Sequence, residues 1–296
     1  MQTYYFANCR LIIDDSLVEP AAQTLKDFSV PLPFSHTFVF RTGDASELEE
    51  RYAEAQNAPV LFQSERFSIH DGGNGWMLTA PECGVTAKTV IQCSRDYSEN
   101  TVYYSPKEYV SPVTQTAQMQ CFSFNNSIRH ICEAGIALNT GIPLHASLVE
   151  SGGFGIAFLG RSGIGKSTQA KLWQKYRGAD FISGDRPCVM NADGVWYAGG
   201  MPWDGKDRIR RQTQVKLRAV VSLEQADCNE ISRLNTRQAL AVLLKQAAIP
   251  MWDSAAASAV TGRLGELARQ IPFYHLKNLA DEESVRLVYR AVTEEI

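Results

Sequence analysis

The most informative stretch of this chain is Gly160-Arg161-Ser162-Gly163-Ile164-Gly165-Lys166-Ser167-Thr168. They match the pattern G-x-x-x-x-G-K-[ST], in which a glycine-rich turn connects a strand to a helix. Residues 155–159, before the turn, form a short apolar run typical of a buried strand, and the apolar residues of 167–176 recur at helical spacing. The succession of strand, glycine turn and helix predicts an α/β domain built around this stretch.

The same turn predicts a site for the phosphates of a nucleotide. Glycines let backbone N–H groups point inward, and the N-terminus of the following helix adds partial positive charge. We expect Lys166 to lie beside the β- and γ-phosphates and the Ser167 hydroxyl to bind Mg²⁺. The alternative is an ordinary glycine-rich turn that carries an exposed lysine. The expected cofactors are ATP and Mg²⁺, held by Gly160, Ser162, Gly163, Gly165, Lys166, Ser167 and Thr168.

Length and composition limit the class of protein. The 296 residues are enough for two domains, and the formal net charge of -3 argues against a protein that mainly grips nucleic acid. The densest basic cluster, within residues 208–211, is interpreted either as a solvated loop or as a group that holds an anion. The seven cysteines are scattered and never spaced as C-x-x-C, which indicates reduced thiols rather than a zinc site or a disulfide framework.

The sequence carries no sign of a membrane segment. Residues 1–6 lack the basic start and apolar stretch of a signal peptide, and no later segment has the uninterrupted apolar length that spans a bilayer. We therefore expect a soluble, cytoplasmic protein that binds neither membrane nor nucleic acid.

Two domains are expected, joined by a linker at 111–116. Residues 1–115 contain short alternating apolar runs separated by turn signals, which predicts a β-rich domain of unknown role with a short helix at 46–56. Its aromatic residues are interpreted as core rather than as a binding platform. Residues 120–296 alternate predicted helices with predicted strands at 144–149, 155–159, 181–183, 217–223 and 273–276. This alternation predicts a mixed α/β nucleotide-binding domain.

Two further side chains are candidates for the phosphate site. Asp185 follows the apolar strand 181–183, where its carboxylate would reach a metal ion beside Ser167. The alternative is an aspartate in a common turn after a strand. Arg186 is interpreted as neutralising phosphate charge or as pairing with Asp185. His145 lies on the strand expected next to the one that enters the glycine turn, so it faces the site or is a satisfied structural histidine.

Residues 199–206 have the glycine and proline density of a shaped loop. Asp204 and Lys206 in this segment would flank a bound phosphate and its acceptor. The alternative interpretation of the segment is a surface hairpin turn.

From His145 to Ser167 the sequence resembles the catalytic domain of bacterial HPr kinase/phosphorylase, whose loop also reads G-x-S-G-x-G-K-S and follows a strand that carries His. The resemblance continues through 181–186, 201–206 and 271–276 and covers about residues 125–296. It implies a phosphoenolpyruvate carboxykinase-like P-loop fold preceded by a smaller β-rich domain, and a capacity for self-association.

The resemblance also assigns roles. Lys166 and Ser167 would hold phosphates and Mg²⁺, Asp185 would be the metal carboxylate, and His145 would lie near the transferred phosphoryl group. Gly184 stands where the family has the first of two adjacent aspartates, the proposed base for the acceptor hydroxyl. The HPr-binding signature near the C-terminus is not evident, which argues against HPr as the acceptor.

The leading hypothesis is an ATP-dependent kinase that phosphorylates a hydroxyl, either serine of a protein or peptide or a small molecule. Its catalytic residues would be His145, Lys166, Asp185, Asp204 and Lys206. The alternative is a nucleotide-binding sensor of weak or no activity that engages a protein partner, which Gly184 favours. A mechanical or transport ATPase is disfavoured, because no water-orienting Glu or Gln follows the strand that ends near Ile182.

Overall fold

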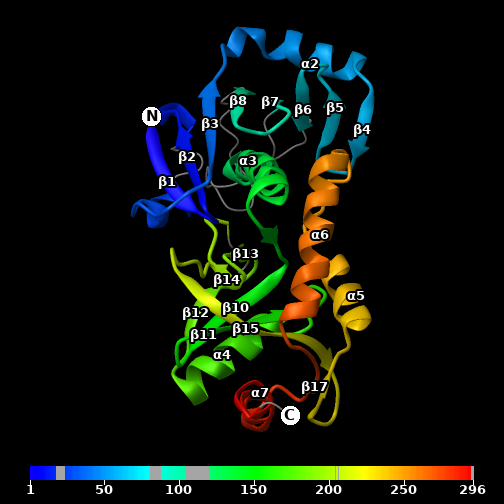
Figure 1. The fold of residues 1–296 in the computed structure, drawn as a ribbon. Coiled ribbons are helices and arrows are strands. Elements are labelled where there is room, and N and C mark those ends of the chain that lie inside the picture. The colour runs from blue at the N-terminus through cyan, green and yellow to red at the C-terminus, as the bar shows by residue number, and fades with distance from the viewer. Residues whose placement is uncertain (18–23, 81–87, 105–119, 204, 206, 295–296) are drawn as a thin grey trace, which may run out of the picture. The chain divides into compact units, whose positions relative to one another are not determined.

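The structure, a computed structural model, describes residues 1–17, 24–80, 88–104, 120–203, 205 and 207–294. It divides into two compact units, each with its own sheet and helices (Figure 1). Unit 1 comprises Met1–Leu138 and Pro250–Ala256, and unit 2 comprises Asn139–Ile249 and Ala257–Ile296. The architecture is therefore mixed α/β, as the alternation of strand and helix patterns predicts.

Unit 1 contains, among its described residues, an eight-stranded sheet in the order β1-β2-β3-β8-β7-β6-β5-β4. The pairs β2·β3 and β3·β8 are parallel, and the other neighbours are antiparallel. The alternation in β2 buries Cys9, Leu11 and Ile13 on one face. The strands span β1 Gln2–Phe6, β2 Cys9–Ile13, β3 His36–Thr42, β4 Val60–Gln63, β5 Ser68–Asp71, β6 Gly75–Ala80, β7 Thr89–Ser94 and β8 Glu99–Tyr104.

Two helices cover opposite faces of this sheet. Leu48 of α2 packs on Val90 and Tyr103. The register of β3 with β8 shows that Phe38 and Tyr103 lie on opposite faces of the sheet. Helix α3 covers the face that carries Phe38, and its Gly135 lies so close that a Cβ built on this glycine would be 2.4 Å from the Phe38 ring. The helices of unit 1 span η1 Lys26–Phe28, η2 Ala45–Glu47, α2 Leu48–Asn57 and α3 Gln120–Asn139.

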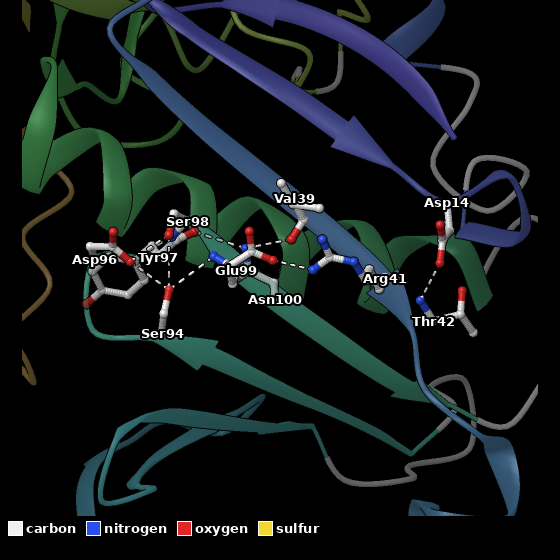
Figure 2. Close-up of polar contacts among 10 residues, drawn as sticks. All are labelled: Asp14, Val39, Arg41, Thr42, Ser94, Asp96, Tyr97, Ser98, Glu99 and Asn100. Atoms are coloured by element: carbon white, nitrogen blue, oxygen red, sulfur yellow. Dashed lines mark hydrogen bonds and ion pairs between the residues drawn. The ribbon is translucent and has the colours of Figure 1, made fainter.

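A polar network fixes β3 beside the turn that joins β7 to β8 (Figure 2). The buried Asn100 amide donates to the carbonyl oxygens of Val39 at 3.2 Å and Tyr97 at 2.9 Å. Arg41 and Glu99 form an ion pair between the same two strands. These contacts satisfy buried backbone groups where β3 and β8 meet, and so help to set their parallel register.

Unit 2 contains, in the part of the chain that the structure describes, a nine-stranded mixed sheet. Its order is β12-β10-β11-β15-β14-β13-β9, and β17 pairs with both β15 and β16. Strand β11 is parallel to β15, whereas β10 runs antiparallel to its neighbours β11 and β12. The strands span β9 Ile142–Pro143, β10 Ala146–Ser151, β11 Phe154–Leu159, β12 Asp180–Ser183, β13 Cys188–Ala192, β14 Val195–Gly199, β15 Gln214–Gln225, β16 Glu230–Arg233 and β17 Phe273–Asn278.

Helices α4 and α7 pack together against one face of this sheet (Figure 1). Phe158 and Val221 from the strands meet Trp173 of α4 and Val288 of α7 in a single buried cluster. The indole of Trp173 is fully buried, which anchors α4 behind the strand that it follows. The helices of unit 2 span α4 Lys166–Arg177, α5 Thr236–Gln246, α6 Ser254–Gln270, whose first residues belong to unit 1, and α7 Glu282–Thr293.

Most predicted elements are present. The strands expected over 155–159, 181–183, 217–223 and 273–276 are β11, β12, β15 and β17, and the helix expected over 46–56 is α2. The aromatic residues of unit 1 are mainly core, as expected, with Phe28, Phe38 and Phe40 fully buried. The linker expected at 111–116 lies outside the described residues.

The division of the chain differs from the expected boundary between residues 115 and 120. Helix α3 belongs to unit 1, and so does the distant segment Pro250–Ala256. Packing explains both differences: Gly135 of α3 lies against Phe38, and the Tyr97 hydroxyl donates to Asp253 Oδ2 at 2.9 Å. These contacts join residues far apart in sequence, which helical periodicity alone does not reveal.

Three further observations concern the classes of protein considered above. Among the described residues, no helix combines the length and apolar character needed to cross a membrane. The same residues contain no group of three or more His, Cys, Asp and Glu placed to hold a metal ion. Among the described residues, five cysteines form no disulfide: the buried Cys9, Cys93, Cys132 and Cys188 and the exposed Cys228.

Candidate functional site

The glycine-rich segment turns directly from β11 into α4. Gly160, Gly163 and Gly165 have φ angles of 149°, 81° and 110°, which residues with a Cβ rarely adopt. A Cβ at Gly163 or Gly165 would meet nothing within 4 Å, so the backbone angle, and not crowding, requires glycine there. Gly165 is the N-cap of α4 and supplies no side chain to the first-turn N–H groups, and that turn contains no acidic residue. The positive end of the α4 dipole therefore lies uncapped by side chains at this segment.

Lys166 folds back over the segment that precedes it. Its Nζ donates to the carbonyl oxygens of Gly160 at 2.9 Å and Arg161 at 3.3 Å, and the residue is only 7% exposed. Burial lowers the pKa of the Lys166 ammonium, and the nearby Asp185 carboxylate partly opposes that shift. Within the described part of the chain this ammonium forms no ion pair, so its hydrogen bonds go to neutral carbonyls and Asp185 acts on it only at longer range.

The order of strands brings three distant segments to the same edge of the sheet. Strand β10 lies between β11 and β12. Ala146 at the start of β10 is paired with Leu159 at the end of β11, and its N–H donates to the Asp185 carbonyl at 2.9 Å. His145, just before β10, and Asp185, just after β12, therefore both lie level with Gly160, where the glycine-rich segment begins.

His145 and Asp185 form a close pair at this edge. The Nε2 atom of His145 lies 3.2 Å from Oδ1 of Asp185. Burial lowers the pKa of His145, the Lys166 cation lowers it further, and the Asp185 carboxylate opposes both. Gly205 lies behind the aspartate: a Cβ there would be 3.0 Å from the Asp185 Cβ, so the absence of a side chain leaves room for this carboxylate.

Most of the predicted site residues that the structure describes line a single cavity. It has a volume of about 430 Å³ and lies wholly within unit 2. That volume is within the usual range for small-molecule sites. We refer to it as the glycine-rich cavity; its lining residues are His145, Ser162, Gly163, Gly165, Lys166, Ser167, Thr168, Gly184, Asp185, Gly205 and Asp207.

Asp207 also lines the cavity, although it was not among the residues expected from the sequence. Its carboxylate accepts a hydrogen bond from Lys171 Nζ at 2.6 Å and is also hydrogen-bonded by the Ser167 hydroxyl. The Lys171 bond, followed by the Ser167 bond, lowers the pKa of Asp207. Two signals were available: Asp207 lies in the same loop as Asp204, and Lys171 lies four residues after Ser167, on the same face of α4.

The remaining predicted residues lie beside the cavity or are not among the residues that the structure describes. Gly160 does not line it, but its carbonyl receives the Lys166 ammonium. Arg186 lies beside Asp185, with Nε 3.7 Å from Oδ2, so the predicted pairing is present. Asp204 and Lys206, the two candidates from the glycine- and proline-rich loop, lie outside the described residues.

The loop that leads to Asp207 is not the surface hairpin considered as its alternative. Met201 is fully buried and Trp203 is 6% exposed. The Gly200 N–H donates to the Thr213 carbonyl at 3.1 Å, which ties the start of the loop to the chain that enters β15. The loop is therefore packed into unit 2, and this burial holds Gly205 and Asp207 at the cavity.

Gly184 occupies an open position in the cavity wall. Its N–H donates to the Ile209 carbonyl at 3.0 Å, and its own carbonyl accepts from the buried Ser147 hydroxyl at 3.1 Å. The atom nearest to a Cβ built at Gly184 is the Asp207 Cβ, at 3.6 Å. A side chain therefore fits here at ordinary contact distance, so neither crowding nor a positive φ requires glycine.

Comparison with known proteins places the chain in a family. The family model described as SynChlorMet cassette protein ScmC matches residues 112–281, more than half of the chain. The chain belongs to this ScmC family. Among solved structures, the Hpr(Ser) kinase/phosphatase from Coxiella burnetii is similar at 11% sequence identity with a TM-score of 0.31, over 51% of this chain and 95% of that chain. No curated protein matches the sequence.

Proposed function

We propose that unit 2 is an HPr kinase-like P-loop domain that binds ATP with Mg²⁺ in the glycine-rich cavity and transfers a phosphoryl group to a hydroxyl. The observation that carries the proposal is the convergence of Lys166, Ser167, His145, Asp185 and Asp207 on one cavity at the N-terminus of α4. The strand order of the sheet brings together His145, Asp185 and the start of α4, and the buried loop after β14 adds Asp207.

The charges of the site suit a triphosphate. The first-turn N–H groups of α4 and the buried Lys166 ammonium offer positive charge that no acidic side chain of that turn neutralises. An anion at this position would be stabilised by the helix dipole and would give Lys166 the counter-charge that neutral carbonyls do not provide. Gly163 and Gly165 leave the space above the backbone open for phosphate oxygens.

The residues present also fit Mg²⁺. This ion prefers oxygen ligands and is commonly held by one or two carboxylates together with substrate phosphates and water. The Ser167 hydroxyl and the Asp185 and Asp207 carboxylates line the same cavity and supply such oxygens. When bound, the ion would neutralise charge on the phosphates. The lowered pKa of Asp207 keeps its carboxylate ionised for this purpose.

His145 is the side chain best suited to take the proton of an acceptor hydroxyl. Its lowered pKa keeps the imidazole neutral near pH 7, so one ring nitrogen can accept a proton. Asp185 would then stabilise the imidazolium that forms, because its Oδ1 is 3.2 Å from Nε2. In this scheme His145 replaces the carboxylate base that Gly184 lacks.

The experiment is nucleotide binding followed by label transfer. The purified full chain is titrated with ATP in the presence of Mg²⁺ and is then incubated with γ-labelled ATP and cell extract. Lys166→Ala should weaken ATP binding by about tenfold or more and abolish transfer, because a charged contact to phosphate is lost. Lys245→Ala, an exposed lysine on α5, is the matched control and should change neither. Transfer that survives in Lys166→Ala would refute the proposal.

A second candidate is a nucleotide sensor, which the open position at Gly184 favours. Such a protein binds ATP in the same cavity but turns it over slowly or not at all. Tight binding of ATP that depends on Lys166, with no label transfer in any extract, would support the sensor over the kinase.

A further inference from the structure

Unit 2 has a second, larger cavity, of about 580 Å³, which we call the basic cavity. Residues 216–218 of β15, 233–236 and 268–273 line it. It lies away from the glycine-rich cavity: Leu217 is level with Gly155 at the beginning of β11, whereas the glycine-rich segment follows the end of β11. The two cavities are therefore at opposite edges of the same sheet.

The lining of the basic cavity carries charge of one sign. Four cations line it, and no Asp or Glu is among its described lining residues: Lys216, Arg218, Arg233 and Arg269. Arg218 already donates from Nε to the Val292 carbonyl at 3.2 Å. Lys216, Arg233 and Arg269 have no ion pair within the described part of the chain, so the inference rests on these three.

The basic cavity differs from the rest of unit 2 in bringing three such cations around one cavity. Elsewhere in the unit some exposed cations are paired, as in Arg211 with Asp180 at 2.5 Å and Lys277 with Glu230 at 2.9 Å, and others that have no ion pair in the described part of the chain, such as Lys245, do not line this cavity. The whole chain has more acidic than basic residues, 32 against 29. Three cations without counter-charge around one cavity are therefore a local excess of positive charge, which favours the binding of an anion.

The cations converge from separate elements. Lys216 is on β15, Arg233 is the last residue of β16, and Arg269 lies in the last turn of α6. Asn235, the N-cap of α5, also lines the cavity. The positive end of the α5 dipole therefore adds to the positive charge of the cations. Guanidinium groups bind phosphate and carboxylate through paired hydrogen bonds, which suits a ligand with several acidic oxygens.

We propose that the basic cavity binds a small organic or inorganic polyanion that carries two or more phosphate or carboxylate groups. Its volume is in the range of small-molecule sites. Three separate cations match two or more acidic groups better than one. This site is independent of the proposed ATP site, because the two cavities have no lining residue in common.

The test is calorimetric titration of the full chain with pyrophosphate and, in a second arm, with citrate. The protein carries Lys166→Ala throughout, which weakens phosphate binding in the glycine-rich cavity. The double variant Arg233→Gln/Arg269→Gln is compared with Arg66→Gln/Lys245→Gln, which removes two exposed cations that line neither cavity. We expect saturable binding of at least one probe, weakened about tenfold or more by the first pair and less than about twofold by the control pair.

The two arms identify the acidic group: tighter binding of pyrophosphate assigns a phosphate ligand, and tighter binding of citrate assigns a carboxylate ligand. Absence of saturable binding, or equal loss in both double variants, would overturn the proposal. Binding of hexaglutamate where both small probes are inert would assign the cavity to an acidic polypeptide and would overturn it as well. Should the first pair fail to fold by circular dichroism, Lys216→Gln, at an exposed side chain of β15, provides the comparison with Lys245→Gln as its control.

Discussion

The Nε2 atom of His145 lies 3.2 Å from Oδ1 of Asp185, in a cavity that Lys166 also lines. Burial and the Lys166 cation both disfavour protonation of the imidazole, and Asp185 favours it. The first two effects prevail, so the pKa of His145 lies below its ordinary value of 6.5. The pair is therefore a neutral imidazole beside a carboxylate near pH 7, which is the form that can accept a proton.

This relationship predicts how stability depends on pH. The unfolded chain binds the His145 proton more readily than the folded chain does, because the pKa is lowered only on folding. The contribution of His145 to the free energy of unfolding should therefore rise with pH from its folded-state pKa to about 6.5 and should be level on either side of that window. His145→Asn should make this part of the profile less steep, while His36 and His70, whose pKa values burial also lowers, keep the rest of the rise. Urea unfolding between about pH 5 and pH 8 measures it.

His275→Asn is the matched control, because it removes a partly exposed imidazole that lies 2.9 Å from Glu224 outside the cavity. An unchanged profile in His145→Asn, or the same flattening in both variants, would contradict the interpretation.

A second prediction concerns Asp207. Asp207→Asn keeps the size of the side chain but removes a charged oxygen that faces Ser167. ATP affinity in the presence of Mg²⁺ should fall by about tenfold, since a charged contact contributes about 1.5–3 kcal/mol. Affinity without Mg²⁺ should change little. Titration with and without the ion measures both.

Asp180→Asn is the control for the same loss of charge, because Asp180 is exposed and pairs with Arg211 away from the cavity. An equal loss of affinity with and without Mg²⁺ in Asp207→Asn would show that the carboxylate acts only on the fold of the loop.

Local patterns in the sequence predicted those strands, helices and turns whose formation depends on residues close together in the chain. The strand before Gly160 and the helix after it follow from apolar periodicity and from the turn. Two further elements also have local signals in the sequence. Asp193 and Gly194 form the turn of the β13–β14 hairpin with φ of 51° and 80°, and Asn235 with Gln238 forms the capping box of α5.

What the sequence could not predict depends on distant contacts. Asp207 lines the cavity because the buried Met201 and Trp203 anchor its loop in the core of unit 2. The placement of α3 in unit 1 follows from Gly135 against Phe38, a contact that no local pattern encodes. The basic cavity is likewise assembled from side chains of three elements, so no single stretch of sequence indicates it.

A third prediction tests why the turn contains glycine. Gly165→Ala should destabilise the protein by about 1–2 kcal/mol, because the φ of 110° strains a residue with a Cβ. Gly262→Ala, within α6, is the matched control: nothing lies within 4 Å of its Cβ, and alanine should stabilise the helix by about 1 kcal/mol. Thermal unfolding of the two variants should therefore shift in opposite directions. A shift of the same sign in both would contradict the assignment of backbone strain.

The fourth prediction separates the kinase from the sensor. Gly184→Asp introduces a carboxylate into the cavity wall at a position where a Cβ has no neighbour closer than 3.6 Å. The variant should therefore fold. If the protein is a phosphotransferase that lacks an efficient base, label transfer should increase by about 10²-fold or more, the usual contribution of a positioned general base. If the protein is a sensor, ATP binding should persist and transfer should stay absent.

Gly184→Ala decides whether any gain comes from the carboxylate. It adds the same Cβ without a proton acceptor, so transfer should remain at the level of the unaltered protein. An equal gain in both variants would trace the effect to a stiffer backbone between Ser183 and Asp185, and not to a base. A loss of transfer in Gly184→Asp, with Gly184→Ala unaffected, would mean that the new carboxylate repels the phosphates beside Asp207, since a built Cβ lies 3.6 Å from the Asp207 Cβ. That result would favour His145 as the proton acceptor, and His145→Asn should then abolish transfer.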